Sequence, residues 1–123
     1  MYFALSNDCF AYANNNTLYF ENLKQKGQKW DAKIKGIQGI ALSGDWIAVV
    51  NQEEIGIYDF CLNLMHLAGT DRKFVTMTAY EDRLVIVYHA SVAIWGCQCL
   101  SMKIFKVGRR MMSFEREALV PIE

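Results

Sequence analysis

An internal repeat with a period of 37 residues constrains this chain more than any other feature of its sequence. The segment ALSND at residues 4–8 recurs as ALSGD at residues 41–45, and Asp82 follows Asp45 after the same interval. The aspartates precede apolar segments that are typical of β-strands, at residues 9–13, 46–50 and 83–88. We therefore expect Asp8, Asp45 and Asp82 to mark equivalent turns between strands.

Polar turns close these strands into hairpins. Asn14-Asn15-Asn16 and Asn51-Gln52 are residue types that tolerate a left-handed backbone, and each group separates two apolar segments. We expect second hairpin strands at residues 17–20 and 54–60, followed by outer strands with one solvated face at residues 29–34 and 63–68. Each repeat then holds up to four strands. The first repeat is expected to lack its leading strand, because only residues 1–5 precede its turn.

A period near 40 residues with four strands per repeat is typical of a β-propeller blade. We therefore predict an all-β chain of WD40-like blades, with three blade repeats at about residues 1–35, 36–70 and 71–120. Propeller rings need roughly four or more blades, so the predicted propeller is incomplete and its apolar blade faces should drive self-association or co-assembly. Middle strands have neighbours on both faces, which predicts that the following side chains are buried: Trp46, Val49, Ile57, Leu84, Ile86 and Val87.

The strand register after Tyr88 has two solutions. Strict repetition places a strand at residues 92–95 and lets residues 111–114 open another blade. Composition instead favours a strand at residues 99–107, a loop over residues 90–97, and a last strand at residues 114–120 that completes the third blade.

Charge and hydropathy exclude several classes of function. The chain has 13 Lys+Arg and 13 Asp+Glu among 123 residues, and this balance offers no general attraction to phosphate, so we expect no direct nucleic-acid contact. No apolar run exceeds five residues, whereas a membrane-spanning helix needs roughly 20, so we expect no membrane partner. The start of the chain carries no secretion signal, which predicts an intracellular protein. The basic stretch of Lys24, Lys26, Lys29, Lys33 and Lys35 is typical of a protected edge strand.

The residues that could carry chemistry are few, and each has a structural interpretation. His66 is expected to be a half-buried strand residue, and His89 to end a strand. Cys97 and Cys99 lack the second ligand pair that zinc requires, and an intracellular location favours free thiols. The acidic pairs Glu53-Glu54 and Glu81-Asp82 fit solvated turns. We therefore expect no enzyme activity, no catalytic residues, no metal and no cofactor.

Several of the strand segments resemble one family. The resemblance rests on residues 39–49, residues 83–89, Gln98-Cys99-Leu100, Gly108-Arg109-Arg110 and Pro121. The family is the SepB-type β-propeller domain of the replisome hub adaptors, known as acidic nucleoplasmic DNA-binding protein or WD-repeat and HMG-box DNA-binding protein, with a chromosome transmission fidelity factor as the yeast member. The chain departs from the family at Gly56, where an arginine is usual, and at the turn Cys61-Leu62-Asn63.

The resemblance implies a nuclear, non-enzymatic scaffold in DNA replication. Such a module links the helicase to the primase-polymerase through protein-protein contacts and forms a homo-oligomer, for which a trimer is the first expectation. Candidate interaction residues are Trp95, Arg109 and Arg110. The alternative is a fragment of an unrelated WD-repeat-type propeller scaffold, in which Tyr58-Asp59 and Ile94-Trp95-Gly96 are eroded WD motifs.

Overall fold

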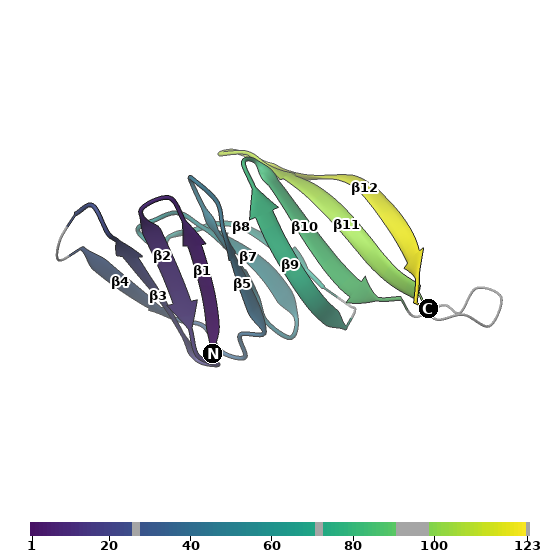
Figure 1. Cartoon of the computed structure of the whole chain (residues 1–123), viewed down its shortest axis with the longest axis horizontal. Helices are drawn as coiled ribbons and strands as arrows, with labels where there is room; N and C mark the ends of the chain where they lie inside the picture. The colour runs from purple at the N-terminus through teal and green to yellow at the C-terminus, as the bar shows by residue number, and fades with distance from the viewer. Residues whose placement is uncertain (26–27, 71–72, 91–98, 123) are drawn as a thin grey trace. The chain divides into compact units, whose positions relative to one another are not determined.

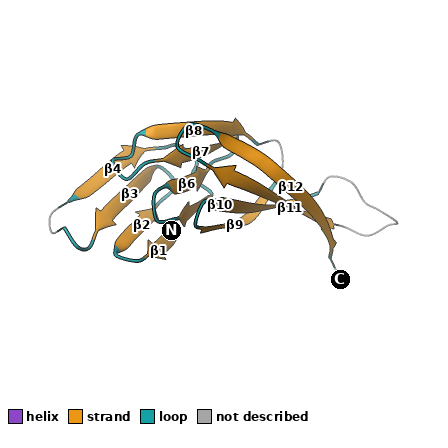
Figure 2. Cartoon of the chain, turned by 90° about the horizontal axis from the view of Figure 1, so that it is seen from above, coloured by secondary structure: helices purple, strands orange, loops and turns teal. Residues whose placement is uncertain are grey.

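The computed structural model describes residues 1–25, 28–70, 73–90 and 99–122. The chain forms two compact units, Met1–Thr70 and Asp71–Glu123. The described residues contain twelve β-strands, arranged in three four-stranded antiparallel sheets (Figures 1 and 2). The predicted all-β architecture of four-stranded repeats is therefore confirmed.

The strands of each sheet follow one another in the chain. The first sheet has the order β1(Tyr2–Ser6), β2(Cys9–Ala13), β3(Thr17–Asn22) and β4(Lys29–Lys33). The second has the order β5(Gly39–Leu42), β6(Ile47–Val50), β7(Glu54–Tyr58) and β8(Leu64–Gly69). The third consists of β9(Phe74–Tyr80), β10(Arg83–His89), β11(Cys99–Val107) and β12(Met112–Pro121).

The first sheet does have a leading strand, and the prediction that it is missing was wrong. β1 pairs with β2 along its whole length, from Tyr2 opposite Ala13 to Ser6 opposite Cys9. Five residues are enough for this strand because every one of them faces a partner on β2.

A hydrophobic core lies between the first and second sheets. It is built from buried side chains of both sheets and of the segment that joins them: Ala11, Ala13, Leu18, Phe20, Ile37, Ile40, Leu42, Ile47 and Val49. The small side chains of Ala11 and Ala13 allow the sheets to approach closely, and the ring of Phe20 meets that of Phe60 edge-on at 4.5 Å. This core makes Met1–Thr70 one packed unit.

The second sheet is buried on both faces of its first two strands. All four residues of β5 and all four of β6 are buried, as are Ile55, Gly56 and Ile57 of β7. The outer strand β8 has only exposed and half-buried positions. The predicted gradient from buried middle strands to a solvated outer strand is thus confirmed in this sheet.

Strand pairing in the third sheet shows which of the two predicted strand registers after Tyr88 is correct. β11 pairs with β10 from Arg83 opposite Lys106 to His89 opposite Leu100, and β12 closes the sheet at residues 112–121. Composition therefore predicted the correct strands, and the prediction that residues 111–114 open another blade was wrong. The alternative strand at residues 92–95 lies outside the described residues.

Burial in β10 follows strict alternation. Leu84, Ile86 and Tyr88 are buried, whereas Val85 and Val87 on the opposite face are half-buried. The predicted burial of Trp46, Val49, Ile57, Leu84 and Ile86 is confirmed. The predicted burial of Val87 was wrong, because only one face of β10 is buried, whereas both faces of β6 are.

The three aspartates of the repeat lie in equivalent turns, as predicted. Asp8 lies between β1 and β2, Asp45 between β5 and β6, and Asp82 between β9 and β10. Two of these turns contain a residue with positive φ, namely Asn7 (51°) and Glu81 (53°). These two residues occupy equivalent positions, two repeats apart.

The asparagine turns close their hairpins by side-chain hydrogen bonds. The Asn14 Oδ1 atom accepts hydrogen bonds from the amides of Asn16 and Thr17, both at 2.8 Å. Asn51, one repeat later, accepts from the amides of Glu53 and Glu54 at 3.0 and 2.8 Å. The predicted turns are confirmed. The reason given for them was wrong, because none of these residues has a positive φ and the turns therefore do not use a left-handed backbone.

Candidate interaction surfaces

The predicted contact residues Arg109 and Arg110 lie together in the exposed turn between β11 and β12. The amide of Gly108 donates a hydrogen bond to the Met111 carbonyl at 2.9 Å, which closes this turn. A Cβ atom at Gly108 would lie 3.1 Å from the same carbonyl oxygen, so the tight turn favours glycine. The arrangement presents two guanidinium groups to solvent. Trp95, the third predicted contact residue, lies outside the described residues.

The two histidines and the described cysteines come from β2, the β7–β8 turn, β8, β10 and β11. His66 is half-buried in β8, as predicted, and His89 is exposed at the end of β10. Cys9 and Cys61 are free thiols, Cys99 is buried, and burial raises the pKa of Cys9. Cys97 lies outside the described residues. Among the residues that are described, no group of three His, Cys, Asp or Glu side chains could hold a metal ion.

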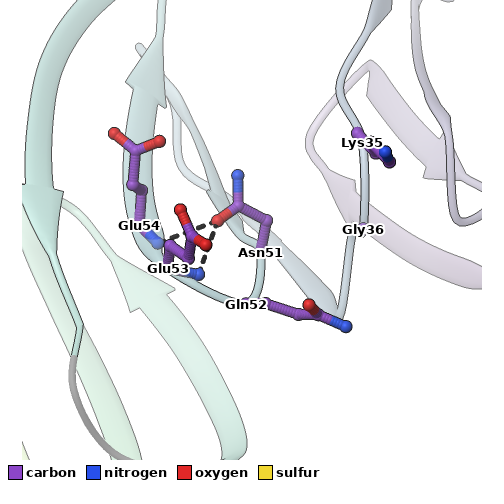
Figure 3. A pocket seen from close by; sticks show the side chains of 6 residues that line it. All are labelled: Lys35, Gly36, Asn51, Gln52, Glu53 and Glu54. Atoms are coloured by element: carbon purple, nitrogen blue, oxygen red, sulfur yellow. Dashed lines mark hydrogen bonds between the residues drawn. The ribbon is translucent and has the colours of Figure 1, made fainter.

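The structure adds a polar pocket that the sequence did not reveal. Its volume is about 430 Å³, and it lies between the β4–β5 connection and the β6–β7 turn (Figure 3). Its lining consists of Lys35, Gly36, Asn51, Gln52, Glu53 and Glu54. Glu53 lies in the β6–β7 turn, as the sequence predicted, whereas Glu54 is the first residue of β7. The pocket is open and contains both signs of charge, unlike the mostly apolar cavities that bind small molecules.

The lysine-rich segment is neutralised in part by neighbouring carboxylates. Lys24 Nζ lies 3.0 Å from Asp8 Oδ2, and Lys29 Nζ lies 3.1 Å from Glu21 Oε1. The hydrogen bond to Glu21 raises the pKa of Lys29. β4 forms the edge of the first sheet and carries exposed charges, as predicted for a protected edge. These pairs weaken the segment as a surface for phosphate.

The first sheet has a second face, which the sequence analysis did not single out. It carries a row of stacked rings, with centroid separations of 6.2 Å for Phe3–Phe10, 5.1 Å for Phe10–Tyr12 and 5.0 Å for Tyr12–Tyr19. Leu5 lies opposite Phe10 in the strand register. Phe3 and Leu5 are 64% and 68% exposed. We call this surface, made of Phe3, Leu5, Phe10, Tyr12 and Tyr19, the aromatic face.

Alternation in the sequence could have revealed this face. In β2 the aromatic residues Phe10 and Tyr12 alternate with the small residues Ala11 and Ala13, and in β1 the large residues Phe3 and Leu5 flank Ala4. Side chains at every second position share one face of a sheet. Knowing which of the two faces is covered required the tertiary structure.

No helix that is long and apolar enough to cross a membrane occurs in the described part of the chain. A search of proteins with curated functions found no match.

The chain is similar in fold to solved structures, of which 24 chains match. A chain of K. marxianus Hsv2 has a TM-score of 0.64 at 11% identity, with 94% of this chain and 37% of that chain covered. A chain in the complex of S. cerevisiae Dbp5 bound to Nup159, Gle1, IP6 and ADP has a TM-score of 0.56 at 14% identity, with coverages of 94% and 42%. The N-terminal domain of Nup159 gives 0.55 at 13% identity, with coverages of 94% and 43%.

These neighbours are WD40-type β-propellers, so the predicted fold class is confirmed: the chain consists of WD40-like blades of an incomplete propeller. At such low identities the likeness concerns the fold alone. The chain spans about two fifths of the length of these solved chains. A family model described as "Minichromosome loss protein, Mcl1, middle region" matches residues 2–123. The chain therefore belongs to the family of the middle region of the minichromosome loss protein Mcl1.

Proposed function

We propose that this chain is a non-enzymatic scaffold module of a DNA-replication hub, which holds other replication proteins together through protein-protein contacts in the nucleus. The observation that carries the proposal is the match of residues 2–123 to the middle region of a minichromosome loss protein. The family name points to chromosome maintenance. The same proposal includes a closer relationship to the SepB-type domain of replisome hub adaptors. It also includes the replicative helicase and the primase-polymerase as partners of this chain.

The described surfaces support binding rather than catalysis. Arg109 and Arg110 are exposed in the turn between β11 and β12, where their guanidinium groups can meet acidic segments of a partner. Arginine is suited to such contacts because its planar group forms bidentate hydrogen bonds with carboxylates. The aromatic face offers an apolar surface of the kind found at protein interfaces.

Binding of the purified chain to immobilised helicase and primase-polymerase subunits of the same organism tests this function. We expect saturable binding to at least one of them, and at least about tenfold weaker binding after Arg109→Glu/Arg110→Glu, because the charge reversal repels an acidic partner. Lys106→Glu is the matched control, since Lys106 is an exposed basic residue of the same hairpin. It should bind like the wild type.

Two results would argue against the proposal. If the folded chain binds neither protein, the hypothesis of a replication hub is contradicted. The alternative, a fragment of an unrelated propeller scaffold, is then favoured. Equal weakening by the double variant and by Lys106→Glu would show that general charge, and not the arginine turn, governs binding.

A further inference from the structure

The outer strand of the second sheet is an edge strand without charged side chains. β8 pairs with β7 on one side, no described strand pairs with its other side, and its six residues include no Asp, Glu, Lys or Arg. Leu64 and Leu67 of this strand are 51% and 56% exposed. The outer strands of the other two described sheets, β4 and β12, both carry exposed charges. Charges on an edge strand discourage pairing with another chain, so of these three outer edges β8 lacks that protection.

The place of β8 in its blade keeps this edge accessible. The second sheet has the order β5, β6, β7 and β8, so β8 is the last strand of the blade. Blades of a propeller pack through the faces of their sheets, as the first and second sheets do in the core. Additional blades on either side would therefore cover sheet faces and leave the edge of β8 open.

The pairing with β7 shows which backbone groups this edge presents. The Thr70 amide donates a hydrogen bond to the Glu53 carbonyl at 2.8 Å. Backbone groups of successive residues in an antiparallel strand point alternately to its two sides, so those of Ala68 also point toward β7, whereas those of Leu67 and Gly69 point away from the sheet. A Cβ atom at Gly69 would meet no atom within 4 Å beyond its chain neighbours. Another strand can therefore approach this edge closely.

A β-bulge limits the regular part of the edge. Ile57 lies opposite His66 and Tyr58 lies opposite Leu64, so Met65 is the extra residue of the bulge. A bulge bends its strand and interrupts regular pairing. The regular edge therefore comprises residues 66–70, which we call the β8 edge.

The hairpin that contains the β8 edge is acidic. Residues 51–70 include three carboxylates, those of Glu53, Glu54 and Asp59, and no Lys or Arg. Glu54 lies opposite Gly69, and Glu53 is bonded through its carbonyl to Thr70, so both glutamates belong to the carboxyl-terminal end of the edge. The third carboxylate already accepts hydrogen bonds within its own turn. The pocket of Figure 3 holds both glutamates and one lysine, which leaves a net negative charge.

We propose that the β8 edge binds an extended segment of a partner protein, which adds a fifth strand to the second sheet and carries Lys or Arg next to Glu53 and Glu54. The outward backbone groups of Leu67 and Gly69 supply the hydrogen bonds, as in other cases of strand addition. The two glutamates select a basic segment over an acidic one. The inference goes beyond the proposed function, because it names a different surface and needs neither the helicase nor the primase-polymerase.

Fluorescence anisotropy with a labelled peptide tests this site on the full chain. The probe is a peptide in which valine and threonine alternate and lysines flank both ends. We expect saturable binding with a Kd of about 10–100 μM, because a short edge offers few hydrogen bonds. The same peptide with methylated backbone nitrogens keeps its side chains but loses its donors, and it should bind at least about tenfold more weakly. A peptide with glutamates in place of the lysines should also bind at least about tenfold more weakly.

Variants of the chain locate the site. Leu67→Lys places a charge on the edge and should weaken binding of the probe at least about tenfold. Leu67→Pro removes an N–H that points away from the sheet, which edge strands tolerate, and it should have a similar effect. Leu23→Lys is the matched control, because Leu23 is an apolar side chain of similar exposure (59%) in the turn after β3. It should bind like the wild type, and circular dichroism verifies that each variant is folded.

A further variant tests the preference for a basic segment. Glu53→Gln/Glu54→Gln keeps the size of both side chains and removes their charge. It should reduce the preference for the lysine-flanked peptide over the glutamate-flanked peptide at least about threefold. An unchanged preference would contradict the role of these two carboxylates.

The proposal is wrong if the folded chain does not bind the probe at about 1 mM peptide. Equal binding of the methylated peptide would show that side chains, and not the backbone of the edge, hold the segment. Equal binding by Leu67→Lys and the wild type would place the site elsewhere. Sedimentation velocity tests a second copy as the occupant: a dimer that Leu67→Lys converts into a monomer would show that β8 pairs with another copy and not with a partner protein.

Discussion

At the scale of single residues, Gly56 shows how one missing side chain shapes the second sheet. A Cβ atom at this position would lie 2.8 Å from Cε2 of Tyr58, closer than packed carbon atoms approach each other. The Tyr58 ring packs against the core cluster, and burial together with the Glu54 carboxylate raises its pKa. In the family that the sequence resembles, an arginine is usual at position 56. In this chain the residue is glycine, and the Tyr58 ring occupies the space where a side chain at this position would begin.

Gly56→Ala should lower the free energy of unfolding by about 1–3 kcal/mol, because the added methyl group displaces the Tyr58 ring. Denaturant unfolding measures the loss. The same substitution in a Tyr58→Ala background should cost clearly less, since the clashing ring is gone. Equal costs in both backgrounds would assign the effect to the backbone and not to the ring.

A pair of neighbours in β10 offers a second test at this scale. Ile86→Ala should cost about 2–5 kcal/mol, because Ile86 is fully buried and its removal leaves a cavity. Val87→Ala is the matched control on the opposite, half-buried face, and it should cost clearly less. Unfolding midpoints in urea measure both. Similar values for the two variants would contradict the alternation of burial along this strand.

At the scale of elements, the asparagine turns link strands in two successive repeats. Asn51→Ala removes the acceptor of two backbone hydrogen bonds in the β6–β7 turn and should cost about 1 kcal/mol in unfolding free energy. Asn51→Asp keeps an oxygen at that position and should preserve most of the stability. Asn14→Ala should have a similar effect on the β2–β3 turn. If Asn51→Asp were as damaging as Asn51→Ala, the hydrogen bonds would not be the cause.

At the scale of the whole molecule, association should show in thermal stability. Self-association, which the sequence predicts, would stabilise the folded chain by mass action, so the melting temperature should rise with protein concentration, by about 2–4 °C for a tenfold increase. Differential scanning fluorimetry between low and high micromolar concentration measures this slope. Leu5→Glu should flatten it, whereas Met111→Glu should leave it unchanged. A wild-type melting temperature that does not depend on concentration would contradict coupling between folding and association.

Much of the architecture could be predicted from the sequence because it is local. Turn residues at a fixed interval, such as Asp8 and Asp45, lie next to the strands that they join, and so the hairpins follow from neighbouring residues. The leading strand β1 escaped prediction because a strand of five residues has little signal of its own, and its pairing with β2 defines it. The register after Tyr88 was likewise open, since two segments of similar apolarity competed until pairing with β10 selected one.

The sequence by itself determined the repeat, the hairpins closed at Asn14 and Asn51 and the polar turns at the repeat's aspartates, because these depend on contacts a few residues apart. Only the tertiary structure decided which face of each strand is covered. Ile47 and Phe10 hold equivalent positions in the repeat, yet Ile47 is buried in the core and Phe10 lies on the aromatic face. The physical reason is that burial depends on whether another sheet lies against that face, and residues distant in the sequence supply that sheet.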